Sequence, residues 1–316
     1  MQVPFSFIAR PVNQRHSYAM YQAKTQNNAQ AASLILMATA FIAATTLMAK
    51  ALGSDAFGPP MHPLQISQGR FLFAFLAIAG AAAVARPALT APHWSMHLAR
   101  TICGWGGITL MFAAVAYIPL ADATAISFLN PVFAMILAIP LLGERVGRIR
   151  WSAAALALLG AMILLRPTPH SFQPAALLAF GAAIIMGMEL IFIKKLSRRE
   201  NPFQILIFNN ALGLLIASLA AIAVWQPPTA AQWGLLAAIG LCMATAQAFF
   251  VNGMARADAS FVAPFSYSTL IFAALFDALI FDVVPDVITW LGAGIIVAGA
   301  IWLALREAWI KSTSPR

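Results

Sequence analysis

The sequence is poor in charged residues: only 9% of its 316 residues are Asp, Glu, Lys or Arg, whereas 61% are apolar. A typical soluble domain carries about 25% charged residues and about 45–50% apolar ones. Because a soluble core cannot hide so much apolar surface behind so few charges, we exclude a soluble globular protein, a disordered chain and a nucleic-acid-binding protein. At about 20 apolar residues per membrane-spanning helix, the apolar positions suffice for roughly ten spans.

Cysteine and histidine are also scarce, with two and five residues respectively. Cys103 and Cys242 lie inside apolar runs, where we expect small buried side chains and not a disulfide or metal ligands. His93 and His97 have the i, i+4 spacing of a helical metal pair. They fall in a predicted loop without a third ligand, so neither a metal nor a cofactor is expected.

What the chain does have is a regular alternation of apolar runs with short polar breaks such as Gly58-Pro59-Pro60 and Pro227-Pro228. No apolar stretch precedes residue 31, so we expect no cleavable signal sequence. The pattern predicts an all-α membrane protein of ten transmembrane helices. The predicted spans are residues 31–49, 63–85, 101–118, 122–142, 150–165, 174–193, 203–225, 232–252, 259–281 and 287–305.

The basic residues predict the orientation of these helices. If the N-terminus is cytoplasmic, 16 of the 19 Lys and Arg residues fall in inner segments. Only Lys50 and Arg166 fall in outer segments, and Arg70 lies within a span. Because Lys and Arg resist translocation, both termini are predicted to be cytoplasmic. We therefore expect a multi-pass protein of the cell inner membrane, in contact with the lipid bilayer.

The two halves of the chain match each other when the sequence is shifted by 139 residues. The matches are Pro63-Leu-Gln-Ile66 on Pro202-Phe-Gln-Ile205, Cys103 on Cys242, Trp151 on Trp290, Gly160-Ala161 on Gly299-Ala300 and, with a slip of three, Ala121-Asp-Ala-Thr124 on Ala257-Asp-Ala-Ser260. Each half holds five spans, an odd number, so the second half enters the membrane from the opposite side. Inverted repeats are typical of secondary transporters, whereas a duplicated scaffold without transport is the structural alternative.

The predicted organisation therefore has four parts. A polar cytoplasmic segment covers residues 1–30, and a cytoplasmic tail covers residues 307–316. Between them, a first repeat of five helices covers residues 31–166 and a second covers residues 174–306.

Several motifs make the sequence similar to a known family. The run Tyr117-Ile-Pro-Leu-Ala-Asp-Ala-Thr-Ala125, Asn130-Pro131, Leu142-Gly-Glu-Arg145 and Gly160 resemble the EamA type of the drug/metabolite transporter superfamily. Pro264-Phe-Ser-Tyr267 and Phe281-Asp-Val-Val-Pro-Asp286 resemble a subgroup that includes carriers of riboflavin and S-adenosylmethionine. The Gly-Glu pair of the second motif is replaced here by Asp282-Val283. The resemblance implies a secondary carrier with a central cavity walled by spans 1, 3, 4, 6, 8 and 9.

Two charged residues inside the spans are candidates for function. Arg70 lies about 10 Å from the outer end of span two, where it either binds an anionic group or snorkels to the lipid headgroups. Glu189 lies about 8 Å from the inner end of span six. It is the candidate for coupling transport to protons, because desolvation favours its neutral form. A salt bridge from Glu189 to Lys194 or Arg70 is the structural alternative.

Polar and aromatic residues supply the other candidate substrate contacts. Pro131 removes a backbone donor and so frees the carbonyl of Ser127, close to Asn130. Aromatic rings can stack on a flat ligand, and amides both donate and accept hydrogen bonds. For single members, hydrogen bonding between helices is the structural alternative. The candidate substrate-binding residues are Arg70, Trp105, Tyr117, Asn130, Gln247, Asn252, Ser266 and Tyr267.

These features favour a transporter of a small organic molecule by alternating access, as a monomer or homodimer. An intramembrane enzyme would need paired acids or a His cluster within the spans, and a channel would usually show a ring of charges or a filter loop. The resemblance implies a cofactor-like heterocycle, riboflavin first and S-adenosylmethionine second. Export of amino acids or other metabolites is the alternative. A small zwitterion would require a dedicated charge pair near the midplane, and we expect no such pair.

Overall fold

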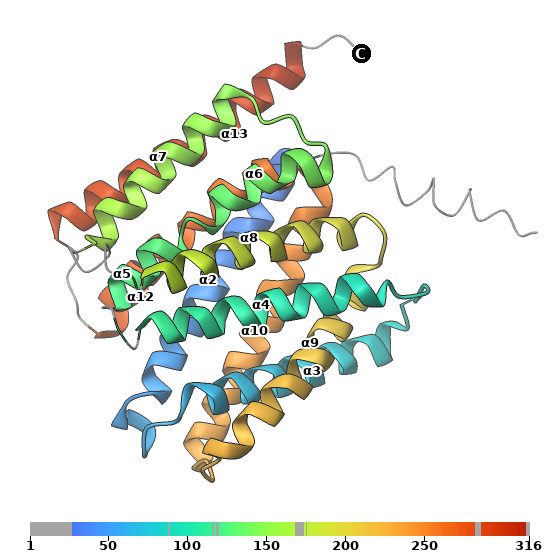
Figure 1. Cartoon of the computed structure of the whole chain (residues 1–316), viewed down its shortest axis with the longest axis vertical. Coiled ribbons are helices and arrows are strands. Elements are labelled where there is room, and N and C mark those ends of the chain that lie inside the picture. The colour runs from blue at the N-terminus through green and yellow to red at the C-terminus, as the bar shows by residue number, and fades with distance from the viewer. Residues whose placement is uncertain are drawn as a thin grey trace, which may run out of the picture.

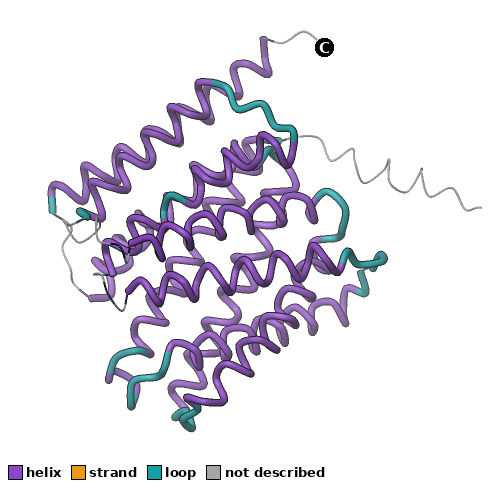
Figure 2. The backbone as a smooth tube through the Cα atoms, viewed as in Figure 1, coloured by secondary structure: helices purple, strands orange, loops and turns teal. Residues whose placement is uncertain are grey.

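The structure, a computed structural model, describes residues 27–87, 89–115, 117, 120–167, 174, 176–281 and 286–313. Within these residues it consists of helices and their connections (Figure 2). Residues 1–26 of the predicted N-terminal segment, Asp282-Val283 of the second motif and residues 314–316 of the tail lie outside the described residues.

The helices follow one another along the chain with short connections. They are α2 (Asn28–Leu52), η1 (Asp55–Phe57), α3 (Pro63–Ala85), α4 (Trp94–Val115), α5 (Leu120–Ser127), α6 (Asn130–Leu142), α7 (Arg148–Leu165), α8 (Ala176–Ser197), α9 (Pro202–Ala221), η3 (Ile222–Val224), α10 (Ala230–Arg256), α11 (Ala259–Val262), η4 (Ala263–Tyr267), α12 (Ser268–Phe281) and α13 (Val287–Thr313).

Ten segments of this series have the length of a membrane span. Nine stretches of the described residues are long and apolar enough to cross a membrane. The tenth segment is α4, whose 22 residues measure about 33 Å at 1.5 Å per residue. Two spans are composite, because α5 and α6 make one and α11, η4 and α12 make another. The predicted all-α membrane fold is confirmed.

The two composite spans are interrupted at corresponding places of the two repeats. Pro131 occupies the first turn of α6, where a missing N–H is tolerated, and Pro264 lies in η4. Phe128 and Tyr267, which are 139 residues apart, meet at these breaks, and the Tyr267 hydroxyl donates to the Phe128 carbonyl at 2.8 Å. Interrupted helices within a membrane need such protein partners and are typical of transporters.

Helices from both repeats pack together in two layers and two outer pairs (Figure 1). One layer contains α6, α8 and α4, and the other contains α12, α2 and α10. The pairs α7 with α13 and α3 with α9 lie at opposite sides of the molecule. Each contact has a counterpart in the other repeat: α2 with α10 corresponds to α8 with α4, and α6 with α8 corresponds to α12 with α2. This symmetry is the one that an inverted repeat requires.

Small residues let these helices approach closely, while large apolar side chains face outward. A Cβ added to Gly160 would lie 2.6 Å from the carbonyl oxygen of Gly292, so α7 and α13 touch through their backbones. Leu215, Leu219 and Leu279 are more than half exposed. Apolar side chains exposed along so many helices fit a surface covered by lipid.

The two ends of the bundle differ in which helices begin there. We call the end at which α4 and α9 begin the His93 end, and the end at which α3 and α10 begin the Gln65 end.

Candidate functional site

A pair of opposite charges lies between α4 and α8. The Nε atom of Arg100 is 3.8 Å from a carboxylate oxygen of Glu189. The Arg100 side chain is only 4% exposed and that of Glu189 is 25% exposed. Arg100 was expected in a loop, but α4 begins at Trp94, so Arg100 lies about 9 Å inside the helix. The sequence did not predict this ion pair, because Arg100 was placed outside the spans.

Glycine makes room for this carboxylate on α4. A Cβ added to Gly104 would lie 3.0 Å from Cδ and Oε1 of Glu189, whereas one added to Gly106 would meet no described atom within 4 Å. A Cβ added to Gly107 would lie even closer, 2.5 Å from Cγ of Met186 on α8. The small residues of α4 thus allow a close approach to α8.

Arg70 is the second cation near Glu189. It is half-buried on α3, its guanidinium carbon lies 4.2 Å from the centre of the Phe71 ring, and it interacts with Glu189 through charge. Lys194 points elsewhere, because its ammonium donates to the carbonyls of Met254, at 2.6 Å, and Ala257. The suggested salt bridge between Glu189 and Lys194 is therefore wrong, and Arg100 is the ion-pair partner.

Three of the predicted amides are already engaged within the protein. Asn130 donates to the Ser127 carbonyl at 2.9 Å and so satisfies the acceptor that Pro131 frees. Gln247 accepts from Asn210 at 2.7 Å, which links α10 to α9. Asn252 donates to Ala248 and accepts from Arg256, both on its own helix. Asn130 on α6 thereby reaches the last residue of α5 and Gln247 reaches α9, whereas Asn252 contacts only its own helix in the described contacts.

The aromatic candidates are separated from one another. Trp105 is half-buried on α4, five residues after Arg100, and Ser266 is half-buried in η4. Tyr117 follows the end of α4 and is 70% exposed, so it does not lie on span three as expected. Tyr267 is fully buried, and its ring packs 5.8 Å from that of Phe128. Its predicted stacking face is therefore occupied by protein.

A buried carboxylate that the sequence reasoning missed lies at the His93 end. Glu200, between α8 and α9, accepts from the backbone N–H of His93 at 2.8 Å and from Gln204 at 2.8 Å. Its two oxygens also lie 2.9 Å from Nδ1 of His93 and 2.8 Å from Nε2 of His97. His97 belongs to α4 and not to the predicted loop. The i, i+4 histidines therefore bind a carboxylate, and among the described residues no His, Cys, Asp and Glu cluster forms a metal site.

The environment of Glu200 favours its charged form. Burial alone raises the pKa of a carboxyl group, but hydrogen bonds from His97 and from the backbone and ring of His93 outweigh burial and lower the pKa of Glu200 to about 2. The spacing of the two histidines was the available signal, but the sequence did not show which acid they meet.

A second buried carboxylate at the same end comes from the Leu-Gly-Glu-Arg motif. Glu144 accepts from the backbone N–H groups of Ala259 and Ser260, at 2.9 and 3.0 Å, and from the Ser260 hydroxyl at 2.7 Å. Arg150 completes the cluster by donating to Asp258 and Ser260. Glu144 thus fastens the start of α11 to the end of α6.

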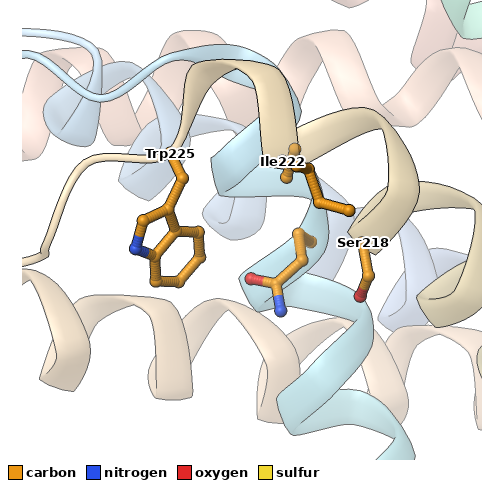
Figure 3. Close-up of a pocket in the computed structure, with 5 residues that line it drawn as sticks. Ser218, Ile222 and Trp225 are labelled. Carbon is orange, nitrogen blue, oxygen red and sulfur yellow. The ribbon is translucent and has the colours of Figure 1, made fainter.

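A surface groove of about 380 Å³ lies between α3 and α9 (Figure 3). It is lined by Gln68, Ser218, Ala221, Ile222 and Trp225. Ile222 is 71% exposed and Trp225 is 48% exposed, as expected for side chains near a membrane–water interface. The groove includes none of the predicted site residues, so we do not assign the substrate to it.

Among the described residues, ten membrane-length segments in two inverted repeats, interrupted helices at matching places and a charge pair between the repeats define a membrane transporter. The model of the EamA-like transporter family matches residues 29–166 and 173–305. The chain belongs to this family, which lies within the drug/metabolite transporter superfamily.

Characterised relatives support the same class. The chain is 35% identical to a riboflavin transporter of Vibrio cholerae over 70% of this chain and 75% of that protein. It is 30% identical to the pseudopaline exporter CntI of Pseudomonas aeruginosa over 66% and 74%. It is 26% identical to an S-adenosylmethionine uptake transporter of Rickettsia prowazekii over 80% and 87%. These names indicate transporters and not enzymes.

The fold also matches a solved crystal structure. That match covers 88% of this chain and 99% of the other chain with a TM-score of 0.76. Because the two sequences are only 20% identical, the match concerns the fold alone.

Proposed function

We propose that this transporter moves a cofactor-like heterocycle across the cell inner membrane by alternating access, with riboflavin as the first candidate. The names of relatives from Vibrio cholerae and Rhizobium johnstonii, at 35% and 34% identity, support riboflavin. The half-buried ring of Trp105, one to two turns along α4 from Arg100, supplies an aromatic surface next in sequence to Gly104, which the Glu189 carboxylate approaches.

The observation that carries the proposal is the ion pair between the buried Arg100 of α4 and the partly exposed Glu189 of α8. Charged groups inside a membrane protein are costly and mark transport pathways. We assign the substrate site to this region, with Arg70, Trp105, Asn130, Gln247, Asn252 and Ser266 as further candidate contacts. Tyr117 and Tyr267 leave the candidate set, because the first is exposed and the second is enclosed by protein.

The same pair supports a second candidate substrate. A zwitterion with a carboxylate, such as S-adenosylmethionine or an amino acid, matches a site with both signs of charge. A relative named for uptake of S-adenosylmethionine shares 26% identity. Export of a metabolite is the other direction that this family supports, since one relative is named an exporter.

We assign proton coupling to Glu189. A partly exposed carboxylate beside Arg100 can take up a proton, release the guanidinium and thereby link protonation to substrate binding. We place both termini in the cytoplasm, which puts the His93 end on the cytoplasmic side. The positive-inside rule supports this orientation.

The experiment is growth of a riboflavin auxotroph that lacks its own uptake system. Expression of the wild type is expected to restore growth at micromolar riboflavin, and Glu189→Gln to remove its dependence on external pH. Gly104→Ala, which crowds Glu189, is expected to reduce uptake, while Gly106→Ala serves as the matched control. Absence of rescue with the protein present in the membrane would exclude riboflavin import, and S-adenosylmethionine and amino acids would then be assayed in vesicles.

A further inference from the structure

Among the described residues, Arg100 is the buried charged residue with the most unsatisfied hydrogen-bond donors. Its Nε and Nη1 groups are enclosed and have no acceptor among the described residues. Glu189 is 3.8 Å from Nε, which is beyond hydrogen-bonding distance. The pair attracts through charge but leaves the guanidinium without the bonds that it can make.

The two buried carboxylates at the His93 end are well satisfied, although Nδ1 of His97 is enclosed there without a partner among the described residues. Glu144 accepts three hydrogen bonds and Glu200 is in contact with four donor groups. Arginine normally pairs with a carboxylate through short, often double, hydrogen bonds. The separation between Arg100 and Glu189 is therefore a local feature of this site, and an unsatisfied buried donor calls for an explanation.

The charges around Glu189 indicate which kind of group would satisfy Arg100. Two guanidinium groups, those of Arg100 and Arg70, attract the carboxylate of Glu189 through charge. Oxygen acceptors, whether carbonyl or carboxylate, would satisfy the free N–H groups of Arg100 and offset the excess positive charge.

We propose that Arg100 is a substrate-binding residue whose free N–H groups donate hydrogen bonds to the acceptor-rich edge of the substrate. This inference rests on the proposed function and names the group by which the substrate is recognised. The acceptors belong either to the carbonyls and ring nitrogens of a neutral flavin or to the carboxylate of an amino-acid-like substrate. Glu189 and the substrate then compete for the same guanidinium.

The test compares Arg100→Gln and Arg100→Lys with the wild type as purified full-length protein in lipid nanodiscs. Arg148→Gln is the control, because Arg148 is an exposed basic residue near the same end of the bundle. Binding of riboflavin is followed by quenching of its fluorescence, and binding of S-adenosylmethionine by calorimetry. Arg100→Gln is expected to weaken binding of the true substrate by about tenfold or more, and Arg148→Gln to leave it unchanged.

The lysine variant distinguishes the two kinds of acceptor. Lysine keeps the charge as a single point and loses the planar set of donors. If Arg100→Lys binds S-adenosylmethionine within about threefold of wild type, the acceptor is a carboxylate. If Arg100→Lys weakens riboflavin binding as strongly as Arg100→Gln does, the acceptors are those of the flavin ring.

A second measurement decides the inference even if the wild type binds neither probe, which would overturn the proposed substrates. In the ligand-free protein, the unsatisfied guanidinium of Arg100 lowers the free energy of unfolding. The double variant Arg100→Leu/Glu189→Gln removes both charges and is therefore expected to raise the thermal midpoint. A lower midpoint would show that the pair is structural and overturn the inference. Wild-type affinity in Arg100→Gln would also overturn it, while leaving the proposed function intact.

Discussion

The two ends of the bundle occupy equivalent positions in the repeats but are closed by different chemistry. At the Gln65 end, the amide of Gln65 both donates to and accepts from the backbone of Gln226, just before α10. At the His93 end, its repeat mate Gln204 accepts from the backbone of Thr90, just before α4. In each repeat, a glutamine on the second helix thus binds the loop that precedes the third helix of the other repeat.

The difference lies in what surrounds each glutamine. At the His93 end, Glu200, His93 and His97 add an ionic network to Gln204. At the repeat offset of 139 residues, Glu200 corresponds to Met61 and His97 to Leu236, which pack in an apolar cluster with Leu52, Ile66 and Ile239. The inverted repeat therefore preserves the position of a closure while its two copies have diverged into a charged version and an apolar version.

The largest effect is expected from removing the carboxylate at the charged end. Glu200→Ala leaves the buried donors of His97 and Gln204 without their acceptor and is expected to lower the free energy of unfolding by about 3 kcal/mol. Met61→Leu at the corresponding position of the Gln65 end is the control and is expected to lower it by less than about 1.5 kcal/mol. Thermal unfolding of the purified proteins measures both. Equal losses would show that the two ends are energetically alike.

A smaller effect is expected from pH, and only at the charged end. The pKa of Glu200 in the folded protein is about 2, below its ordinary value of 4.5. Its stabilising contribution is therefore complete above about pH 5 and is lost as the pH falls through the folded pKa. The stability difference between wild type and Glu200→Gln should stay constant from pH 8 to 5 and shrink towards pH 3. Thermal midpoints of both proteins are measured across this range. A difference between wild type and Glu200→Gln that grew on acidification would contradict a stabilising charged form of Glu200.

The smallest effect is expected from an exposed ion pair at the Gln65 end. Arg166 donates to Asp286 and, with Thr289, lowers the pKa of that carboxyl group below its usual range. Both side chains are about half exposed, so solvent screens the pair. Arg166→Gln is expected to leave the thermal midpoint unchanged. A loss comparable to that of Glu200→Ala would show that this end also depends on charge.

Hydropathy and the repeat were sufficient to predict the fold, because apolar runs of membrane length and an odd number of spans leave few architectures. The site was harder to predict from sequence. Arg100 and His97 were assigned to a loop because polar residues lower the local hydropathy, whereas α4 begins six residues before Arg100. A helix start marked by histidine and arginine has the composition of a loop, and only packing against α8 and Glu200 shows that these side chains are buried.

The sequence showed which polar and aromatic side chains lie within the spans, but it did not show which neighbours each side chain faces. Glu189 was identified as a buried carboxylate, and its partner was not, since spacing along one chain does not show which helices become neighbours. Tyr267 was expected to face a ligand, but its repeat mate Phe128 takes that place. Rings and amides that contact protein in the fold cannot be told from rings and amides that face a cavity by sequence alone.

The central claim is that the two ends open alternately around one site. The most direct measurement crosslinks each end reversibly in a variant whose Cys103 and Cys242 are replaced by alanine. Cysteine pairs at Thr90 with Gln204 and at Gln65 with Gln226 are oxidised separately, and substrate uptake into vesicles is followed before and after reduction. Closing either end alone is expected to stop uptake, and reduction to restore it. Uptake that continues with one end verified as crosslinked would contradict alternating access.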